Sequence, residues 1–314
     1  SVLCGTVTAV FIFLIAAHLL EKLTRGEKSF AARFVVLGGA AAAAIVPSFL
    51  YTAWTNTTEF EVYAVATATI LLCSWLTLRM GAVESAARTQ RTVLLLIYLV
   101  ALSIANHLIV LLAAPAVVLY VLLLDSTRRA YWLSVICSMT GLYLLVLKGI
   151  DLDKVGLTLD KHHAAGPLHL GTILWSLAAG LPDVLVSLGA HVQSWKAFII
   201  GLLVCAVSFW WANRQRALGF VGLASGLFLL GFSIHLYLLI RSGFHPAINE
   251  GGPDNFAAFW SVIGREQYGS AYGILPRQVW TVITGKTAIG NLNDLVDNIR
   301  VFFVHNVPFY TKYF

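Results

Sequence analysis

Two glutamates, Glu59 and Glu61, stand just before a long apolar run that begins at Val62. Carboxylates at the start of a membrane-embedded helix are costly unless they have a task, and no basic residue accompanies them in segment 55–61. Here they could act as a general base, bind a metal ion or contact an acceptor hydroxyl. Thr58 and Glu61 also have the spacing of a capping box, in which both side chains satisfy backbone N–H groups of the first helical turn. The box would explain Glu61 but not Glu59, which points about 200° away from it around the helix.

A second polar pair, Asn106 and His107, interrupts the apolar stretch 92–124. Asparagine is a favoured N-cap residue, so Asn106 could simply start the helix that follows it. His107 could anchor the chain at the membrane surface, or it could donate a hydrogen bond to a phosphate or a sugar hydroxyl. We expect two short helices that meet here in a tight turn and leave a dent at the outer face. A lipid-borne substrate could meet a water-borne one in such a dent.

A third polar group follows the last apolar run and consists of Arg241, Arg265, Glu266, Gln267 and Tyr268. Arginine can grip a phosphate with two parallel N–H donors, and a neighbouring amide and phenol could contact a sugar. The alternative for Arg265 and its neighbours is a solvated turn closed by Gly269. We therefore treat this group as a candidate substrate-binding segment.

Other catalytic chemistries have weak support. Asp160, His162, His163 and His169 are of metal-ligating types, but their spacing matches no common zinc pattern, so we assign no metal site to them. A divalent metal ion remains open as a cofactor. The chain has no Walker loop, no GxSxG and no CxxC pair, which argues against nucleotide hydrolysis, serine hydrolysis and redox chemistry.

The composition places these residues in a membrane protein. Of the 314 residues, 59% are hydrophobic and only 11% are charged, whereas a soluble domain has about a quarter of its residues charged. A water-soluble enzyme is thereby excluded. The four cysteines are scattered through apolar runs, which excludes a secreted disulfide scaffold. The net charge of +6 comes from short basic clusters between apolar segments, as in a topology signal rather than a nucleic-acid-binding surface.

We predict an all-α, polytopic membrane protein with about eight spans, because a bilayer core needs roughly 20 apolar residues per helix. The expected spans are 2–20, 34–54, 62–78, 92–104, 107–124, 130–147, 196–212 and 217–240. Segment 168–190 is long enough to be another span, but it contains Pro182 and Asp183, which favours an interfacial or re-entrant outer segment. With eight spans, all four arginine-bearing loops fall on one side, and that side is predicted to be cytoplasmic. These loops are 21–33, 79–91, 125–129 and 213–216.

The chain is expected to have two parts. Residues 1–240 would form the transmembrane module, which includes an outer loop and interfacial segment at 148–195, and residues 241–314 would form an outer segment. In the outer segment we expect a short helix from Asn255 to Ile263 that places three aromatic side chains on one face. This face, formed by Phe256, Phe259 and Trp260, should rest on the membrane or on other outer loops.

Three stretches carry a resemblance to a known family: TTEFEVYAVATA (57–68), LSIANHLIVLLAAPAVV (102–118) and IRSGFHPAINEGGPDNFAAFWSVIGREQYGS (240–270). They resemble a family of multi-spanning membrane proteins that is common in Bacteroidetes-type bacteria and was long catalogued as a domain of unknown function. The chain departs from the family pattern in having the single proline Pro246 where two are usual, and Gly264 where an asparagine is usual. Neither change touches residues 265–268.

The resemblance implies a GT-C-like glycosyltransferase related to an animal membrane protein O-mannosyltransferase. Such enzymes take a sugar from a polyprenyl- or dolichyl-phosphate carrier and place it on a hydroxyl, often of a Ser or Thr in an exported protein. It also implies a multi-pass protein of the bacterial inner membrane with a periplasmic active face. In this superfamily an acidic residue of the first outer loop usually acts as the catalytic base, and the corresponding segment of the family lies upstream of Ser1. Family members also continue past a stretch like Tyr310–Phe314. We therefore expect the chain to be incomplete at both ends.

The leading interpretation is a lipid-phosphosugar-dependent glycosyltransferase. Glu59, Glu61 and His107 would be catalytic, while Asn106, Arg241 and residues 265–268 would bind substrate. The expected partners are membrane lipids, a polyprenyl-phosphate sugar, an exported protein or glycan acceptor and a membrane complex, but no nucleic acid. A transporter or flippase is the first alternative, although the mid-span regions carry almost no charge. A non-catalytic scaffold subunit of an envelope complex is the second.

Overall fold

The computed structural model describes residues 2–24, 26–58, 62–81, 86–124, 128–163, 168–249 and 251–264. Within these ranges the protein is built from helices and contains no β-strand. Seven described helices are long and apolar enough to cross a bilayer by length and composition. This arrangement confirms the predicted fold class of an all-α, multi-pass membrane protein.

The seven spanning helices follow the predicted order. They are α1 (Val2–Leu23), α2 (Phe30–Ser48), α4 (Val62–Met80), α5 (Ala86–Ile104), α7 (Arg129–Tyr143) with the π-helical turn η3 (Leu144–Lys148), α10 (Trp195–Arg214), and the continuous run α11 (Leu218–Phe232), η5 (Ser233–His235) and α12 (Leu236–Ser242). The eighth predicted span, 107–124, is shorter: a 3₁₀ turn, η1 (Leu108–Leu112), leads into α6 (Ala113–Leu124).

Two of the predicted boundaries are wrong. The span expected at 34–54 ends at Ser48 and is followed by a separate short helix, α3 (Tyr51–Thr58). Pro47 has no N–H to offer the last turn, and the Phe49 N–H turns back to the carbonyls of Val46 and Pro47. The span expected at 92–104 begins six residues earlier, so only the second helix of the predicted short pair is short.

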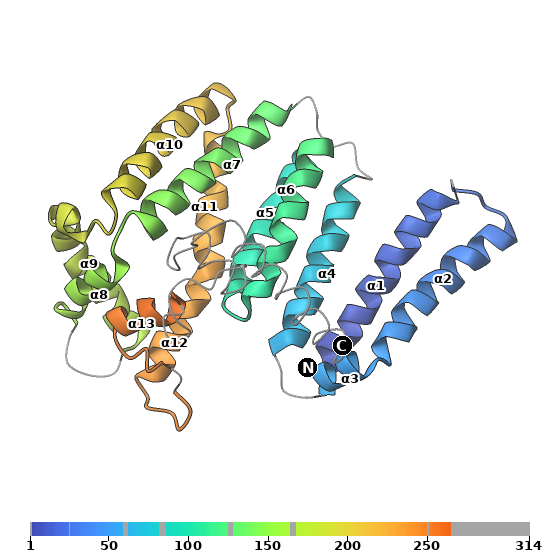
Figure 1. The fold of residues 1–314 in the computed structure, drawn as a ribbon, viewed down its shortest axis with the longest axis horizontal. Coiled ribbons are helices and arrows are strands. Elements are labelled where there is room, and N and C mark those ends of the chain that lie inside the picture. Colours follow the sequence, from blue (N-terminus) through green and yellow to red (C-terminus); the bar gives the residue numbers. More distant parts are fainter. Residues whose placement is uncertain are drawn as a thin grey trace, which may run out of the picture.

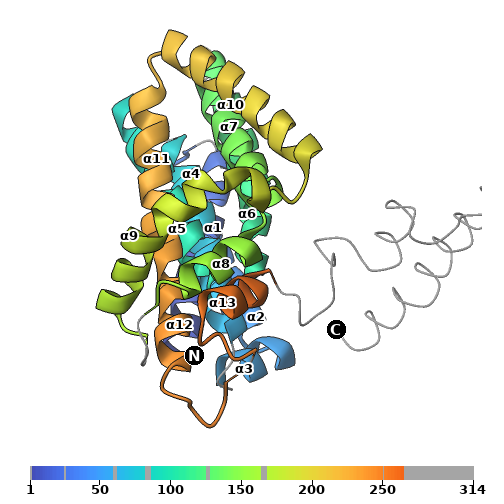
Figure 2. The same cartoon turned by 90° about the vertical axis from the view of Figure 1, so that its left-hand side faces the viewer.

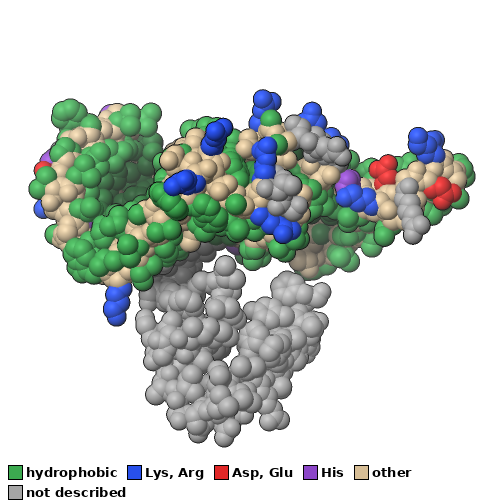
Figure 3. Space-filling view, turned by 90° about the horizontal axis from the view of Figure 1, so that it is seen from above, with side chains coloured by type: hydrophobic (Ala, Val, Ile, Leu, Met, Phe, Trp, Pro, Cys, Tyr) green, Lys and Arg blue, Asp and Glu red, His purple; other side chains and the backbone are tan. Residues whose placement is uncertain are grey.

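The described helix ends that carry the arginine-rich loops all lie at one end of the molecule (Figure 1). The C-terminal ends of α1, α4, α6 and α10 and the N-terminal ends of α2, α5, α7 and α11 meet there, as the loop pattern predicts. We call this the basic end. Figure 3 looks onto it, and lysine and arginine side chains are spread across it. The chain after α5, the helix α3 and the end of α12 lie at the opposite end.

Small residues let neighbouring spans pack closely. A Cβ atom on Gly231 of α11 would lie 2.8 Å from the carbonyl oxygen of Tyr98 in α5, and one on Gly201 of α10 would lie 2.7 Å from the backbone of Leu145. Both glycines therefore bring helix backbones together, as is typical of membrane helix interfaces. Trp132, with its ring edge-on to that of Phe220, fills the junction of α7 and α11.

Beside α12, short helices form a separate cluster that we call the outer cap. It consists of α8 (Leu152–Asp160), α9 (Leu170–Val186), η4 (Leu188–His191) and α13 (Phe256–Ile263). Figure 2 shows α8 and α13 stacked next to α12 toward the end opposite the basic end. The cap has its own apolar core, to which all three of its α-helices and α12 contribute. Of the cap helices, α9 is a shorter apolar helix of 17 residues and is not one of the seven long spans.

The predicted helix at 255–263 is confirmed as α13. Asn255 caps it, and Phe256 and Phe259 are each only 2% exposed. The carboxylate of Asp160 in α8 accepts hydrogen bonds from the N–H groups of Phe256 (2.8 Å) and Ala257 (3.2 Å). The aromatic face of α13 therefore packs on the other cap helices, which is one of the two predicted placements.

Candidate functional site

The turn at Asn106 and His107 follows directly from the end of α5. The backbone N–H groups of both residues donate to the carbonyl of Ser103, at 3.0 and 2.9 Å, and close the helix. His107 then has extended backbone, with φ −162° and ψ 133°, and its Nδ1 accepts the N–H of Ile109 at 3.1 Å. His107, not Asn106, is thus the N-cap of the following helix, which corrects the alternative reading of Asn106.

Asn106 instead ties the turn to α4. Its side-chain amide donates to the carbonyl of Val62, the first residue of α4, at 2.9 Å. The ring of the next residue, Tyr63, packs on the ring of His107, with centroids 4.9 Å apart and planes inclined by 50°. The structure therefore joins the residue that directly follows Glu61 in the chain, Val62, to the turn at Asn106, 44 residues later.

The hydrogen bond at Nδ1 limits what His107 can do. A ring nitrogen that accepts an N–H carries no proton of its own, so the proton of the neutral imidazole sits on Nε2. In this state His107 is a hydrogen-bond donor through Nε2. Its other ring nitrogen, Nδ1, already accepts the backbone N–H of Ile109. The geometry suits donation to a phosphate or hydroxyl oxygen better than general-base catalysis.

Glu59 and Glu61 lie outside the described residues, as does the capping box that Glu61 would complete. The element before them is well placed: Thr57 of α3 packs against Gly5 of α1, where a Cβ would lie 2.6 Å from the Thr57 methyl group. Thr58 is the last residue of α3, and its hydroxyl donates to the carbonyl of Trp54 at 2.9 Å. The two glutamates thus stand in the chain between α3 and the tyrosine that contacts His107.

Arg241 is exposed in α12, which packs against α13. No hydrogen bond or ion pair of the described residues joins its side chain to the turn at His107. Arg265, Glu266, Gln267 and Tyr268 lie outside the described residues.

Three of the residues of metal-ligating type between 160 and 169 serve as caps or links, namely Asp160, His162 and His169. Asp160 caps α13, and His169 caps α9 by accepting the N–H of Thr172 at 3.2 Å. His162 contacts Asp183 of α9, with 2.8 Å between Nε2 and Oδ2. In the described ranges, no group of three or more His, Cys, Asp or Glu side chains is arranged to hold a metal ion.

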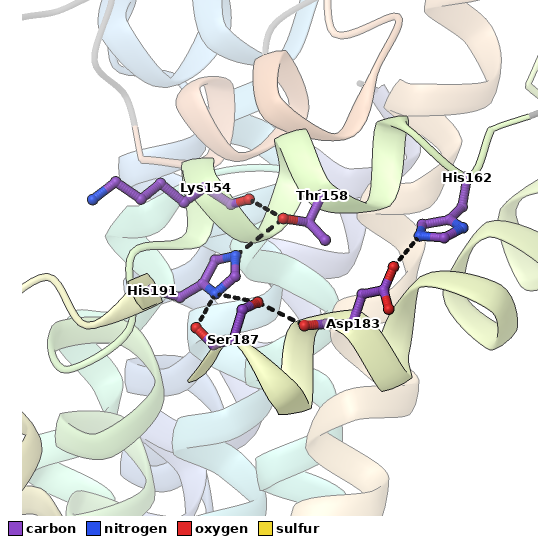
Figure 4. A network of polar contacts seen from close by, with 6 residues as sticks. All are labelled: Lys154, Thr158, His162, Asp183, Ser187 and His191. Carbon is purple, nitrogen blue, oxygen red and sulfur yellow. Dashed lines mark hydrogen bonds and ion pairs between the residues drawn. The ribbon is translucent and has the colours of Figure 1, made fainter. Parts of the chain in front are cut away.

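The outer cap holds a polar network that the sequence pattern does not indicate (Figure 4). His191 is only 5% exposed and lies between α8 and the end of α9. Its Nε2 is 3.0 Å from the Thr158 hydroxyl, and its Nδ1 is 2.6 Å from the Ser187 carbonyl. The Ser187 carbonyl can only accept, so Nδ1 carries a proton. The Thr158 hydroxyl lies 3.0 Å from His191 Nε2 and 3.0 Å from the Lys154 carbonyl, to which it donates. The spacing of Ser187 and His191 is the one local sequence feature that could indicate this network, because Thr158 is 33 residues away in the chain.

Comparison with known proteins finds a similarity over the first part of the chain. Residues 1–130 match a family described as the protein O-mannosyl-transferase TMEM260 N-terminal domain. The match covers α1 to α6, and so includes positions 59 and 61 and the turn at His107. It supports the predicted link to the animal membrane protein O-mannosyltransferase. No curated protein and no solved structure matches the chain.

Proposed function

We propose that this chain belongs to a membrane glycosyltransferase that moves a sugar from a lipid-phosphate carrier to a hydroxyl acceptor. The observation that carries the proposal is the contact between the start of α4 and the turn at Asn106 and His107. It lies inside the segment that is similar to the O-mannosyl-transferase family. A histidine donor thus stands beside the helix that directly follows two glutamates in the chain.

The placement of charge suggests which side of the membrane this contact faces. It lies at the end opposite the basic end (Figure 1), and basic loops mark the cytoplasmic side of membrane proteins. The contact would then face outward, which is the periplasm if the protein sits in a bacterial inner membrane. On that side a polyprenyl-phosphate sugar and the Ser or Thr hydroxyls of exported proteins are the fitting substrates.

Each candidate residue has a role that fits its chemistry. A carboxylate at Glu59 or Glu61 would take the proton from the acceptor hydroxyl as its oxygen attacks the sugar carbon. The bond from that carbon to the carrier phosphate breaks, and the charge stays on the phosphate. Nε2–H of His107 could donate to a phosphate or sugar oxygen, while Arg241 or Arg265 would hold the leaving phosphate. Glu266, Gln267 and Tyr268 would contact the sugar.

The buried polar groups speak against transport as the main activity. Secondary transporters carry ionisable residues and broken helices near the bilayer midplane. Of the residues that the structure describes, no Asp, Glu, Lys or Arg is buried. Buried serines such as Ser134 and Ser138 donate to carbonyls of their own helix. Apart from the buried His235 in η5, the described spans therefore lack the charged groups that a transporter's pathway needs.

The test is sugar transfer by membranes that contain the full chain. A radiolabelled polyprenyl-phosphate sugar is the donor, and a Ser/Thr-rich peptide is the acceptor. We expect Glu59→Gln to lower the transfer rate by at least about 100-fold, the effect of losing a general base. Glu21→Gln, at the basic end of α1, is the matched control and should keep the wild-type rate. Absence of transfer by the wild-type chain, or an equal rate in Glu59→Gln and wild type, would contradict the proposal.

A further inference from the structure

A cavity lies between α4 and α5 at the basic end, away from the turn at His107. It has a volume of about 430 Å³. Arg79 and Arg88 line it together with the hydroxyl side chains Thr89 and Thr92, and Trp75 is among its apolar lining residues. We call this cavity the basic-end pocket.

Neighbouring helices hold the wall of the pocket in place. The guanidinium of Arg79 lies over the ring of Trp75, with its carbon 5.6 Å from the ring centroid. The ring of His18 in α1 meets the same tryptophan edge-on at 6.0 Å. Just after α4, Gly81 packs so closely on the Tyr120 hydroxyl of α6 that no Cβ would fit. Trp75 and the end of α4 are therefore fixed from two sides.

The pocket carries two positive charges, one from Arg79 and one from Arg88. Neither Arg79 nor Arg88 forms an ion pair with a described acidic residue. Two guanidinium groups on one cavity raise its electrostatic potential, which a bound anion would lower. The planar fork of arginine matches the oxygens of a phosphate. Basic pockets between membrane helices on the cytoplasmic side are known to take lipid head groups.

We propose that the basic-end pocket binds the phosphate group of an anionic membrane lipid. Arg79 and Arg88 grip the phosphate, and the apolar wall of Trp75, Leu76 and Met80 meets the lipid beyond its head group. This apolar wall favours a lipid over free phosphate as the source of the group. The site is separate from the proposed sugar-transfer site, because it lies at the other end of α4 and α5.

The test measures the thermal unfolding of the full chain in detergent with three probes: phosphatidylglycerol, phosphatidylcholine and inorganic phosphate. We expect phosphatidylglycerol to raise the unfolding temperature of the wild type more than the other two. In native mass spectrometry, the dissociation constant for phosphatidylglycerol should rise about fivefold for each arginine removed. The variants are Arg88→Gln and the double variant Arg79→Gln with Arg88→Gln.

Arg91→Gln is the matched control, because Arg91 is exposed on the same helix and does not line the pocket. It should bind phosphatidylglycerol like the wild type. If the double variant does not fold, the single change at the exposed Arg88 gives the same comparison. Stabilisation by inorganic phosphate that is lost in Arg88→Gln would support the phosphate site with free phosphate as its source. Equal lipid binding by Arg88→Gln and wild type, or an equal loss in Arg91→Gln, would overturn the proposal.

Discussion

At the scale of single residues, His107 has two duties that can be separated. Its Nδ1 caps the helix after the turn, while Nε2 carries the donor hydrogen. His107→Asn keeps an acceptor for the cap, because the amide oxygen can reach the same N–H group. It removes the Nε2 donor. We expect this variant to fold normally and to transfer sugar about 100-fold more slowly, the lower end of the loss typical of one charge-stabilising donor.

The measurement is the sugar-transfer rate alongside the unfolding temperature. His107→Phe is the companion variant: it keeps a ring against Tyr63 but loses the cap, so it should lower the unfolding temperature as well. A wild-type transfer rate in His107→Asn would show that His107 serves the turn alone.

The residue types in the sequence indicate this candidate site, but they do not predict which residues contact one another. An N-cap is one of the two interpretations that the sequence allows for Asn106, because asparagine often caps helices. Its amide instead donates to the carbonyl of Val62, 44 positions away in the chain. Once Asn106 is turned toward α4, the extended His107 is the residue that can reach the N–H of Ile109. His191 was overlooked for the same reason, since its partner Thr158 comes from another helix. Long-range packing, which no local spacing encodes, decides these hydrogen bonds.

At the scale of helices, local sequence signals predict that a helix forms better than they predict the residues at which it begins and ends. The cap at Asn255 and the spacing of Phe256 and Phe259 are both local, so α13 was placed within one residue of its start. The apolar length of 34–54 hid the break after Ser48, because the residues on both sides of it are apolar. The start of α5 was placed late because Arg88 and Arg91 interrupt the apolar run but are good helix formers.

One helix-scale prediction concerns Asp160, which holds α13 on α8. Its carboxylate accepts two N–H groups of the first turn of α13, and Asn255 takes the third. We expect Asp160→Ala to weaken the attachment of α13 by about 1–2 kcal/mol, since it removes a charged cap from a helix N-terminus. Faster proteolysis within residues 244–255 would report this loosening. Lys161→Ala, the neighbouring change, should leave the proteolysis rate unchanged.

A second helix-scale prediction concerns the outer face of α9. The side that packs in the cap contains Ile173, Ser176 and Gly180, while Leu174, Trp175 and other large apolar side chains on the opposite side are exposed. A helix with such a face is expected to lie in the membrane interface. The experiment uses a chain whose native cysteines are replaced by serine. In membranes, Leu174→Cys should react with a water-soluble maleimide at least about tenfold more slowly than Gly189→Cys. Equal reaction rates would place this face in water.

At the scale of the whole molecule, the two ends of α4 and α5 carry different chemistry. The arginines cluster where α4 ends and α5 begins, and the turn that joins Asn106 to Val62 sits at the other end. The fold thus places the arginine-bearing helix ends at one end of the molecule and the contact between Asn106 and Val62 at the other. The loop pattern predicted this sorting correctly, because a chain that crosses the bilayer repeatedly must place alternate loops together.

The orientation of the molecule follows from this sorting and can be tested directly. The positive-inside rule predicts that the basic end faces the cytoplasm, so Glu27, in the loop after α1, should face inward. Ile248 follows α12 at the opposite end and is 89% exposed. In intact bacterial spheroplasts, Ile248→Cys should react with a membrane-impermeant maleimide, whereas Glu27→Cys should react only after permeabilisation. The reverse pattern would put the turn at His107 in the cytoplasm, where a lipid-phosphate sugar presented from the outer face could not reach it.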